Sequence, residues 1–452
     1  MTANDKIKKN DNVTLEILNY GCNAEGVAKY NGETVFVPYS LIGEKVNTTI
    51  IKANSKYSVA KINSIDKKSD LRIQAPCPFY TKCGGCQLQH TSYINALKIK
   101  TEIVQNAISN IGKLNYTVPI TIASENEYHY RNKIAMPINP KTRRLGMFRT
   151  GTHNIVDIDN CLLQKDQIVN LIETINQYLT VTKNSIYDER TGKGLLKTVV
   201  AREINNEILV TIVINGNKLN DEELLINLLS KKFDKIGISL NINKLKNNVI
   251  LTDDFIHIYG QQSIEINEFG IKYEINNQSF LQINDDVKNM IYKRIFDEAK
   301  NDIVINTYSG AGLLSAMLSK ISKQVYGIEI VEAATKLADK LKAKNNIQNL
   351  HNICGDCSVE LPKLLNTLTE AEKQNLTLVL DPPRKGCDIS VLEAIIKTKP
   401  TKIIYVSCDP STLARDLKIL LSNEQYKVKY IQQFDMFPQT KHVETLTVII
   451  KK

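Results

Sequence analysis

A thiol and a carboxyl group lie in the C-terminal half of the chain at positions where catalytic residues are often found. Asp381 opens the segment Asp-Pro-Pro-Arg-Lys-Gly, directly after the apolar run of residues 376–380. Cys408 follows the next apolar run, residues 402–407. Ligands of open α/β sheets bind at the carboxyl ends of the strands, so both residues are expected at one edge of a sheet. Most cysteines at strand ends are small buried hydrophobic residues, but the neighbouring acid favours a reactive thiol here.

Such a thiol suits the alkylation of a pyrimidine at C5. That carbon is a poor nucleophile until a thiolate adds at C6 and generates an enolate, which can attack a sulfonium methyl group. A base must then remove the C5 proton so that the thiol is expelled. We predict Glu444 as this base, with its pKa raised by partial burial. His442 is the alternative, although a histidine at the start of a strand is more often a hydrogen-bonded structural residue.

A glycine-containing loop predicts a nucleoside-binding site. Residues 308–312 read Tyr-Ser-Gly-Ala-Gly, and Glu329 ends the next apolar run. Glycines let the backbone approach a ligand, and a carboxylate about 20 residues on can accept ribose hydroxyls. Ser315 stands where a dinucleotide site would have a third glycine, so S-adenosylmethionine is favoured over NAD. Asp356 is predicted to meet the adenine edge. As alternatives, Glu329 is a solvated strand end and Asp356 a helix N-cap.

The elements that position these residues follow an α/β pattern. Apolar runs alternate with helical segments over residues 264–452, which predicts a doubly wound, Rossmann-like sheet. Two final runs, residues 428–431 and 443–450, have no long helix between them and predict an antiparallel edge. Residues 12–66 show short alternating strands broken by glycines, typical of a small barrel of the oligonucleotide-binding type. A docking module remains an alternative there.

A basic stretch in the middle of the chain predicts contact with single-stranded RNA. Residues 129–150 contain no acidic residue and include the aromatic residues Tyr130 and Phe148. Guanidinium groups neutralise phosphates, and aromatic rings stack on bases. The alternative is a solvated hairpin face. The predicted RNA-binding residues are Arg131, Lys133, Arg143 and Arg144.

Composition limits the classes of protein that fit. A chain of 452 residues, 42% hydrophobic and 23% charged, is expected to fold into two or three domains and not to be disordered. It has neither an apolar run of about 18 residues nor the apolar segment of a secretory signal, which predicts a cytoplasmic protein without a membrane span. The formal charge of +10 favours a polyanionic partner. Nine cysteines point to metal ligation or thiol chemistry.

Three segments resemble the hallmark motifs of the RNA uracil-C5 methyltransferases that depend on S-adenosylmethionine. They are Asp381-Pro-Pro-Arg-Lys-Gly386, Ser407-Cys-Asp-Pro-Ser-Thr-Leu-Ala-Arg-Asp-Leu417 and Asp435-Met-Phe-Pro-Gln-Thr-Lys-His-Val-Glu444. The resemblance covers nearly the whole chain. It implies that Cys408 is the nucleophile and Glu444 the proton-abstracting base. It also implies a cofactor pocket lined by Gln282, Tyr308, Glu329 and Asp381, with Asp381 also reading the uracil edge.

The resemblance also bears on a cysteine-rich loop. Cys77, Cys83 and Cys86 follow a C-x5-C-x2-C spacing, and Cys161 lies far downstream. Four thiolates could bind zinc or a [4Fe-4S] cluster, and the spacing leaves both open. Family members with this arrangement carry the iron-sulfur cluster, which implies a structural cluster here, because methyl transfer moves no electrons.

The domains expected from the resemblance are a TRAM-like RNA-binding barrel (5–66), a central α+β domain with the cluster and the RNA face (75–263) and a methyltransferase domain (264–452). Barrel plus cluster is similar to the branch that acts on large-subunit ribosomal RNA. The leading hypothesis is therefore a monomeric enzyme that methylates C5 of a uridine in folded 23S rRNA. Transfer RNA is the second candidate target. A non-catalytic RNA-binding assembly factor is the third hypothesis, because Asn306 stands where relatives usually have Asp.

Overall fold

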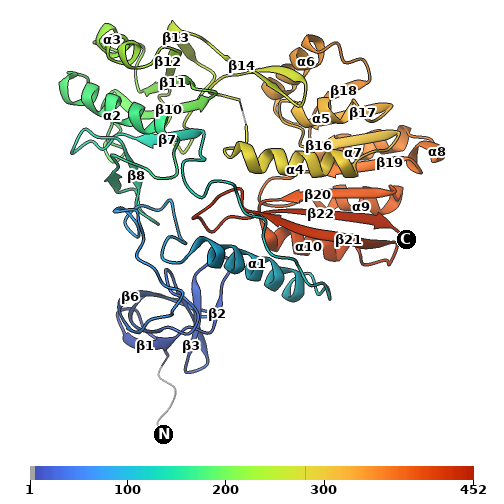
Figure 1. Ribbon diagram of the computed structural model, residues 1–452, viewed down its shortest axis with the longest axis horizontal. Coiled ribbons are helices and arrows are strands. Elements are labelled where there is room, and N and C mark those ends of the chain that lie inside the picture. Colours follow the sequence, from blue (N-terminus) through green and yellow to red (C-terminus); the bar gives the residue numbers. More distant parts are fainter. Residues whose placement is uncertain (1–5, 280) are drawn as a thin grey trace. The chain divides into compact units, whose positions relative to one another are not determined.

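The computed structural model of the protein describes residues 6–279 and 281–452 (Figure 1). The chain divides into two compact units that interleave along the sequence. Unit 1 comprises residues 1–81, 86–124 and 380–452, and unit 2 comprises residues 82–85 and 125–379. The three consecutive domains expected from the sequence remain a prediction.

Unit 1 begins with a six-stranded sheet, drawn in blue in Figure 1, with the order β1-β5-β6-β4-β3-β2. The pairings in it are antiparallel except for the parallel pair β4 and β6. Alternate side chains fill its core, among them Ala28, Val35 and Val46, which are fully buried. The Leu18 N–H donates to the Val27 carbonyl at 2.9 Å, which joins the end of β1 to β3 and helps to close the barrel. The strands are β1 (Asn12–Glu16), β2 (Asn19–Tyr20), β3 (Gly26–Tyr30), β4 (Glu33–Val37), β5 (Lys45–Ala53) and β6 (Ser58–Lys67).

Helix α1 (Tyr93–Asn110) follows the cysteine-rich loop. The Ser92 hydroxyl caps its N-terminus by accepting from the Asn95 N–H. Ala96, Ile99 and Ile103 recur at helical spacing, and this apolar face packs against Leu41 of the barrel in one buried cluster. On another side, α1 packs against α10 (Pro410–Leu420). The helix therefore ties the barrel of unit 1 to its C-terminal part.

The C-terminal part of unit 1 contains three strands in the order β20-β22-β21, drawn in red in Figure 1. Both pairings are antiparallel, with Ser407 opposite Thr445 and Phe434 opposite Glu444. The predicted antiparallel edge is thus confirmed. The strands are β20 (Lys402–Ser407), β21 (Tyr426–Phe434) and β22 (Glu444–Lys451), and α9 (Ile389–Thr398) precedes them.

Unit 2 contains a five-stranded sheet with the order β13-β12-β11-β10-β7. Two helices accompany it, with α2 packing against β10 and α3 against β12. The hairpin between β10 and β11 turns through Asn205 and Asn206, both left-handed, as a two-residue hairpin turn requires. The elements are β7 (Lys133–Pro137), α2 (Asp166–Val181), β10 (Leu196–Ile204), β11 (Glu207–Ile214), α3 (Glu222–Lys232), β12 (Ile236–Ile242) and β13 (Phe255–Gly260).

The second half of unit 2 has the strand order β18-β17-β16-β19. The pairs of β16 with β17 and of β17 with β18 are parallel, with helices between consecutive strands, which confirms the α/β alternation read from the sequence. The elements are α4 (Asp285–Glu298), β16 (Ile303–Thr307), α5 (Leu313–Leu318), β17 (Gln324–Glu329), α6 (Glu332–Lys344), β18 (Leu350–Cys354), α7 (Cys357–Thr367), α8 (Glu370–Lys373) and β19 (Leu376–Leu380). Two hairpins complete the unit, β8 (Gly146–Phe148) with β9 (Ile155–Asp157) and β14 (Ile264–Glu268) with β15 (Ile271–Ile275).

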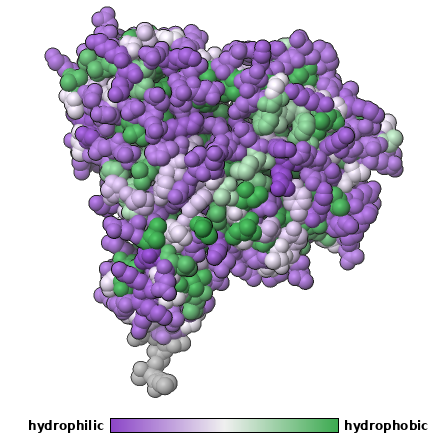
Figure 2. Space-filling model, viewed as in Figure 1, coloured by the Kyte–Doolittle hydropathy of each residue, from purple (hydrophilic) through white to green (hydrophobic). Residues whose placement is uncertain are grey.

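Hydrophilic side chains cover most of the face that Figure 2 shows, with apolar residues in patches between them. Across residues 6–279 and 281–452, no helix combines the length and the apolar character needed to cross a membrane.

Candidate active site

The predicted nucleophile, Cys408, lies in the turn between β20 and α10 in unit 1. Asp409 caps the helix, and its carboxylate accepts from the N–H groups of Ser411 at 2.9 Å and Thr412 at 3.1 Å. The Ser407 hydroxyl donates to the Asp409 carbonyl at 3.0 Å and accepts from its N–H at 3.2 Å. These hydrogen bonds fix the backbone on both sides of the thiol.

Two carboxyl groups and one guanidinium group act on the pKa of this thiol. Cys408 is half-buried, and burial raises its pKa to about 11, followed by the nearby charges of Glu444 and Asp381. The Arg384 guanidinium acts in the opposite direction and lowers the thiol pKa. The structure therefore brings Cys408, Glu444 and Asp381 within electrostatic reach of one another. It adds Arg384, which the sequence analysis did not single out, although it lies three residues after Asp381 in the same motif.

Both carboxyl groups of this site favour their neutral forms. Glu444 opens β22 and is only 5% exposed, and burial, then the charge of Asp381, raises its pKa well above the usual value. Burial also raises the pKa of Asp381 to about 7. A carboxyl group with a raised pKa is a stronger proton acceptor once it is ionised. His442, the alternative base, stacks edge-on against Phe437 with ring centroids 5.8 Å apart.

Helix α10 also holds the loop that carries Arg384. The buried Asp416 carboxylate accepts from the Cys387 N–H at 2.9 Å and the Tyr405 hydroxyl at 2.6 Å. Gly386 in this loop has φ +78°, and a Cβ there would come within 2.5 Å of Arg415 Nη2 and 2.7 Å of Asp416 Oδ2. The glycine is therefore needed for both its backbone conformation and the space behind it.

The predicted nucleoside loop belongs to unit 2. Tyr308, Gly310 and Gly312 all have positive φ, between 55° and 85°. Glu329 stabilises the turn, because its carboxylate accepts from the Gly310 N–H at 2.9 Å and the Val331 N–H at 2.8 Å. A Cβ on Gly310 would meet no atom within 4 Å, so open space lies over this glycine. An open glycine turn beside an ordered carboxylate fits the ribose of a nucleoside cofactor.

The other predicted cofactor residues of unit 2 have defined local roles. Asp356 is exposed and caps α7, its carboxylate accepting from the Ser358 N–H at 2.8 Å, as its alternative interpretation expected. Its neighbour Gly355 donates to the Glu329 carbonyl at 2.9 Å, so these two strand ends are adjacent. Gln282 is half-buried, and its carbonyl accepts from the Asn132 side chain at 3.0 Å.

The four cysteines predicted to bind a cluster are all half-buried. Cys77 and Cys86 belong to unit 1, and Cys83 and Cys161 to unit 2. The Cys83 sulfur accepts from the Gly85 N–H at 3.3 Å. Within the described ranges, no three His, Cys, Asp or Glu side chains are grouped so as to hold a metal ion. The iron-sulfur cluster therefore stays a prediction from the sequence.

Two arginines of the predicted RNA-binding stretch have partners within the protein. The Arg143 guanidinium donates to the carbonyls of Leu179, Thr182 and Asn184 at 2.9 to 3.1 Å, which satisfies acceptors at the end of α2. Arg144 is ion-paired with Asp159. These two arginines therefore have partners within unit 2, and the segment after β9 supplies the acid that pairs with Arg144.

For Arg131 and Lys133, contact with RNA stays a prediction. Both are half-buried, and Arg131 Nε donates to the Lys133 carbonyl at 3.2 Å. Burial, then the charge of Arg202, lowers the pKa of Lys133 to about 8. Lys133 and the fully buried Arg202 stand directly opposite each other on β7 and β10. This pair of like charges was not expected from the sequence.

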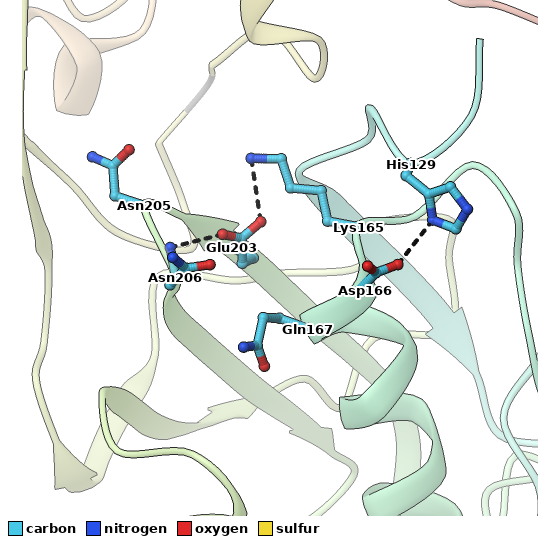
Figure 3. Close-up of a pocket in the computed structure, with 7 residues that line it drawn as sticks. All are labelled: His129, Lys165, Asp166, Gln167, Glu203, Asn205 and Asn206. Carbon is cyan, nitrogen blue, oxygen red and sulfur yellow. Dashed lines mark hydrogen bonds and ion pairs between the residues drawn. The ribbon is translucent and has the colours of Figure 1, made fainter. Parts of the chain in front are cut away.

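A pocket of about 500 Å³ lies at the start of α2 in unit 2 (Figure 3). Lys165 and Glu203 form an ion pair of 3.2 Å in it, and His129 Nδ1 lies 3.1 Å from an oxygen of Asp166. With two acids against one lysine, this pocket suits a polyanion poorly. Its lining residues are His129, Lys165, Asp166, Gln167, Glu203, Asn205 and Asn206, none of which is a predicted site residue.

The profile of the tRNA (Uracil-5-)-methyltransferase family matches residues 92–452, and that of the TRAM domain matches residues 9–62. The chain belongs to the tRNA (Uracil-5-)-methyltransferase family. Both the family and the N-terminal TRAM domain read from the sequence are thus confirmed.

The alignments of this methyltransferase with similar proteins span almost the whole chain. It is 36% identical to an uncharacterized RNA methyltransferase of Clostridium tetani, over 98% of this chain and 97% of that protein. It is 36% identical to another from Listeria innocua, over 99% of each. The solved structure of Pyrococcus abyssi tRNA (uracil-54, C5)-methyltransferase in complex with S-adenosyl-L-homocysteine is 25% identical and superimposes with a TM-score of 0.78, over 97% of this chain and 100% of that one. The protein is therefore an S-adenosylmethionine-dependent RNA methyltransferase of the uracil-5 type.

Proposed function

We propose that this methyltransferase converts a specific uridine of 23S ribosomal RNA to 5-methyluridine through a covalent bond between Cys408 and C6. The single observation that carries the catalytic assignment is the joint site of Cys408, Glu444 and Asp381, in which both carboxyl groups raise the pKa of the thiol and Asp381 raises the pKa of Glu444. Perturbed thiol and carboxyl groups in one half-buried site are typical of catalysis.

Cys408 performs the first step in this proposal. Its thiolate adds to C6 of the uracil ring, the C6–S bond forms, and the electron pair of the C5–C6 double bond moves toward C5 and O4. The rigid turn between β20 and α10 holds the sulfur in place, and Arg384 is the cation that favours the thiolate. Asp381 in its neutral form can donate a hydrogen bond to a uracil carbonyl, which is consistent with its pKa of about 7.

Glu444 performs the last step. It removes the C5 proton, the electron pair of the C5–H bond restores the C5–C6 double bond, and the C6–S bond breaks to release the Cys408 thiolate. Burial supports this role, because it raises the proton affinity of the Glu444 carboxylate.

We propose five residues for binding the cofactor, as the family resemblance implies and the nucleoside loop predicts: Gln282, Tyr308, Glu329, Asp356 and Asp381. S-adenosylmethionine supplies an electrophilic methyl group on a sulfonium centre when it is bound. The Glu329 carboxylate, already oriented by two backbone N–H groups, is proposed to accept the ribose hydroxyls. Replacement of Glu329 by Ala should weaken cofactor binding, measured by calorimetry without RNA.

The choice of 23S rRNA rests on the TRAM domain together with the C-x5-C-x2-C spacing and distant Cys161, which resemble the ribosomal branch of the family. Transfer RNA is the second candidate, because the similar Pyrococcus abyssi structure is that of a tRNA (uracil-54, C5)-methyltransferase. A methyl-transfer assay separates the two. The purified protein is incubated with labelled S-adenosylmethionine and unmodified 23S rRNA or tRNA, and methylated positions are located by mass spectrometry. Label in tRNA alone would overturn the ribosomal target.

The same assay addresses the non-catalytic alternative. Replacement of Cys408 by Ala should abolish methyl transfer while leaving RNA binding intact. Asn306, the residue that motivated this alternative, is 2% exposed and donates to the Ser315 hydroxyl at 2.9 Å. The amide is therefore accommodated inside unit 2. Absence of methyl transfer by the unmodified enzyme on both RNAs would favour an assembly factor.

We further propose that Cys77, Cys83, Cys86 and Cys161 bind a structural [4Fe-4S] cluster, on the strength of the family resemblance and the donor set. Iron and sulfide are measured after anaerobic purification of the unaltered protein and of the Cys161→Ser variant. About four iron and four sulfide per chain in the former, and a loss in the latter, is the expected result. Zinc without sulfide would exclude the cluster.

A further inference from the structure

The loop between β21 and β22, residues 435–443, leads directly to Glu444 and contains no regular secondary structure. Here it is called the β21–β22 loop. Gln439 within it is 2% exposed and has φ +65°, a left-handed conformation that is uncommon for a residue other than glycine. Such a conformation persists where the surrounding structure holds it. The contacts around the loop show what holds it.

A buried ion pair fixes the start of the β21–β22 loop. Lys100 of α1 and Asp435 are each 0% exposed at their side chains, and Lys100 Nζ lies 2.5 Å from Asp435 Oδ1. The same ammonium group donates to the Phe437 carbonyl at 3.0 Å. One lysine from a distant part of the sequence therefore holds two residues of the loop. Removing one partner of a buried pair leaves a charge without compensation, so this contact is sensitive to substitution.

The segment after the third predicted cluster cysteine holds the middle of the loop. The N–H groups of Gln87 and Leu88 both donate to the Gln439 carbonyl at 3.0 Å. The Gln87 side chain returns a third bond, because its Oε1 accepts from the Lys441 N–H at 3.1 Å. Two backbone bonds and one side-chain bond thus converge on the residue with the left-handed conformation and on its near neighbour.

The contacts that fix Cys408 are separate from these. Its turn is held by Ser407 and Asp409, neither of which bonds to the β21–β22 loop. Ser407 also stands opposite Thr445 across β20 and β22, so the strand ladder is common to the nucleophile and the proposed base. The loop contacts are the set that Glu444 does not share with Cys408. A change that loosens the loop should disturb Glu444 while leaving the Cys408 turn in place.

We propose that Lys100 and Gln87 are positioning residues that hold Glu444 for removal of the C5 proton. This inference rests on the proposed function, in which Glu444 acts only after the Cys408–C6 bond has formed. Loosening the loop slows the step in which the C5–H and C6–S bonds break and the C5–C6 double bond is restored. The earlier step, in which the C6–S bond forms, is affected less. Variants should therefore accumulate the covalent protein–RNA adduct.

The test compares five substitutions in the full-length enzyme, with the RNA substrate and S-adenosylmethionine. Gln87→Ala removes the hydrogen bond from the Lys441 N–H without creating a buried charge, and Lys100→Met removes the ammonium group. Lys98→Met, at an exposed position of the same helix, is the matched control, and Glu444→Gln is the reference for a missing base. The adduct is measured by denaturing electrophoresis, and the release of 5-methyluridine RNA by single-turnover kinetics.

We expect adduct to rise several-fold in Gln87→Ala and Lys100→Met, with product release at least about tenfold slower and cofactor binding unchanged, while Lys98→Met behaves as the unaltered enzyme. Lys100→Arg should restore part of the release rate. A merely structural defect would lower adduct formation and release together. If Lys100→Met does not fold, Gln87→Ala decides alone.

The variants distinguish an error in the assignment of the base from an error in the assignment of the positioning residues. If Glu444→Gln accumulates no adduct, the assignment of the base is wrong. If Glu444→Gln traps the adduct but Gln87→Ala and every folded Lys100 variant partition between adduct and product as the unaltered enzyme does, the positioning role is wrong and the proposed function stands.

Discussion

At the scale of single residues, the chemistry of the site is set by the surroundings of one thiol. Cys408 has a pKa of about 11 because burial disfavours the thiolate and two acids lie nearby. Ring addition needs the thiolate. In the free enzyme the thiol of Cys408 is therefore mostly protonated. Among the groups that shift its pKa, Arg384 is the one whose charge favours the thiolate.

The first prediction concerns the pH dependence of this thiol. Removing a neighbouring negative charge stabilises the thiolate, so Asp381→Asn and Glu444→Gln should each lower the pKa of Cys408, whereas Arg384→Met should raise it. The rate of Cys408 alkylation by iodoacetamide is measured by peptide mass spectrometry between pH 7 and pH 11. The exposed Cys354 serves as an internal reference. Identical pH profiles in all four proteins would contradict the electrostatic coupling.

The second prediction concerns Lys133, which faces Arg202 across the strand pair. The pKa of Lys133 is lowered to about 8, so between about pH 8 and its unfolded value near 10.4 the unfolded chain binds more protons. Stability then rises with pH over this range. Lys133→Met should be more stable than the unaltered protein at pH 7, by about 1 kcal/mol or more, and should lose this rise.

Urea unfolding followed at several pH values measures the effect on Lys133. Lys141→Met, at an exposed position of the same basic stretch, is the control and should change stability little. A destabilised Lys133→Met variant would show that the hydrogen bond from Lys133 Nζ to the Asn277 carbonyl, 3.4 Å long, outweighs the cost of burial and the repulsion from Arg202. The same variant should bind RNA more weakly if Lys133 contacts phosphate, so stability and binding would move in opposite directions.

At the scale of elements, most of the strands that carry the site could be predicted, because apolar runs report burial directly. The ends of β16, β17, β19 and β20 fall within a residue or two of the predicted runs. The contacts by which α10 holds the loop that carries Arg384, here called the α10 clamp, could not be predicted. The sequence shows Asp416 as one more acid on an amphipathic helix, and only the fold brings its carboxylate to the Cys387 N–H and the Tyr405 hydroxyl.

The third prediction tests this clamp through Gly386. Gly386→Ala places a Cβ 2.5 Å from Arg415 Nη2 in addition to straining a positive φ. Gly43 is a matched control, because it has φ +83° and nothing within 4 Å of a Cβ. Gly43→Ala should cost about 1 kcal/mol from the backbone alone, and Gly386→Ala clearly more.

Gly386→Ala should also displace Arg384 and raise the pKa of Cys408, which the alkylation assay reports. Gly43→Ala should leave that pKa unchanged. Equal losses of unfolding free energy in the two variants would contradict this prediction. They would show that the side chains of α10 can move away from a Cβ at position 386 without a cost in stability.

At the scale of the whole molecule, charge is where sequence and structure differ most. The excess of ten positive charges and the basic stretch of residues 129–150 predicted an RNA surface. In the structure, Arg143 donates to carbonyls at the end of α2, and Arg144 pairs with Asp159, which lies outside the stretch in sequence; RNA contact by these two arginines stays a prediction. Linear spacing records neither relation, because both depend on the hairpin of β8 and β9 and on the approach of α2.

The fourth prediction separates arginines that support the fold from cations that bind RNA. A side chain that neutralises one phosphate contributes about 0.7 to the slope of log affinity against log salt concentration for single-stranded RNA. Arg131→Ala and Lys133→Met should therefore each reduce the steepness of that slope by roughly this amount. Arg143→Ala should leave the slope unchanged and instead lower the unfolding free energy by about 1 to 3 kcal/mol, because three carbonyls lose their donor. Fluorescence anisotropy with a labelled RNA at several salt concentrations, beside urea unfolding of the same variants, measures both quantities. A flatter slope for Arg143→Ala with unchanged stability would contradict this prediction. It would show that Arg143 binds RNA and that its hydrogen bonds at the end of α2 contribute little to stability.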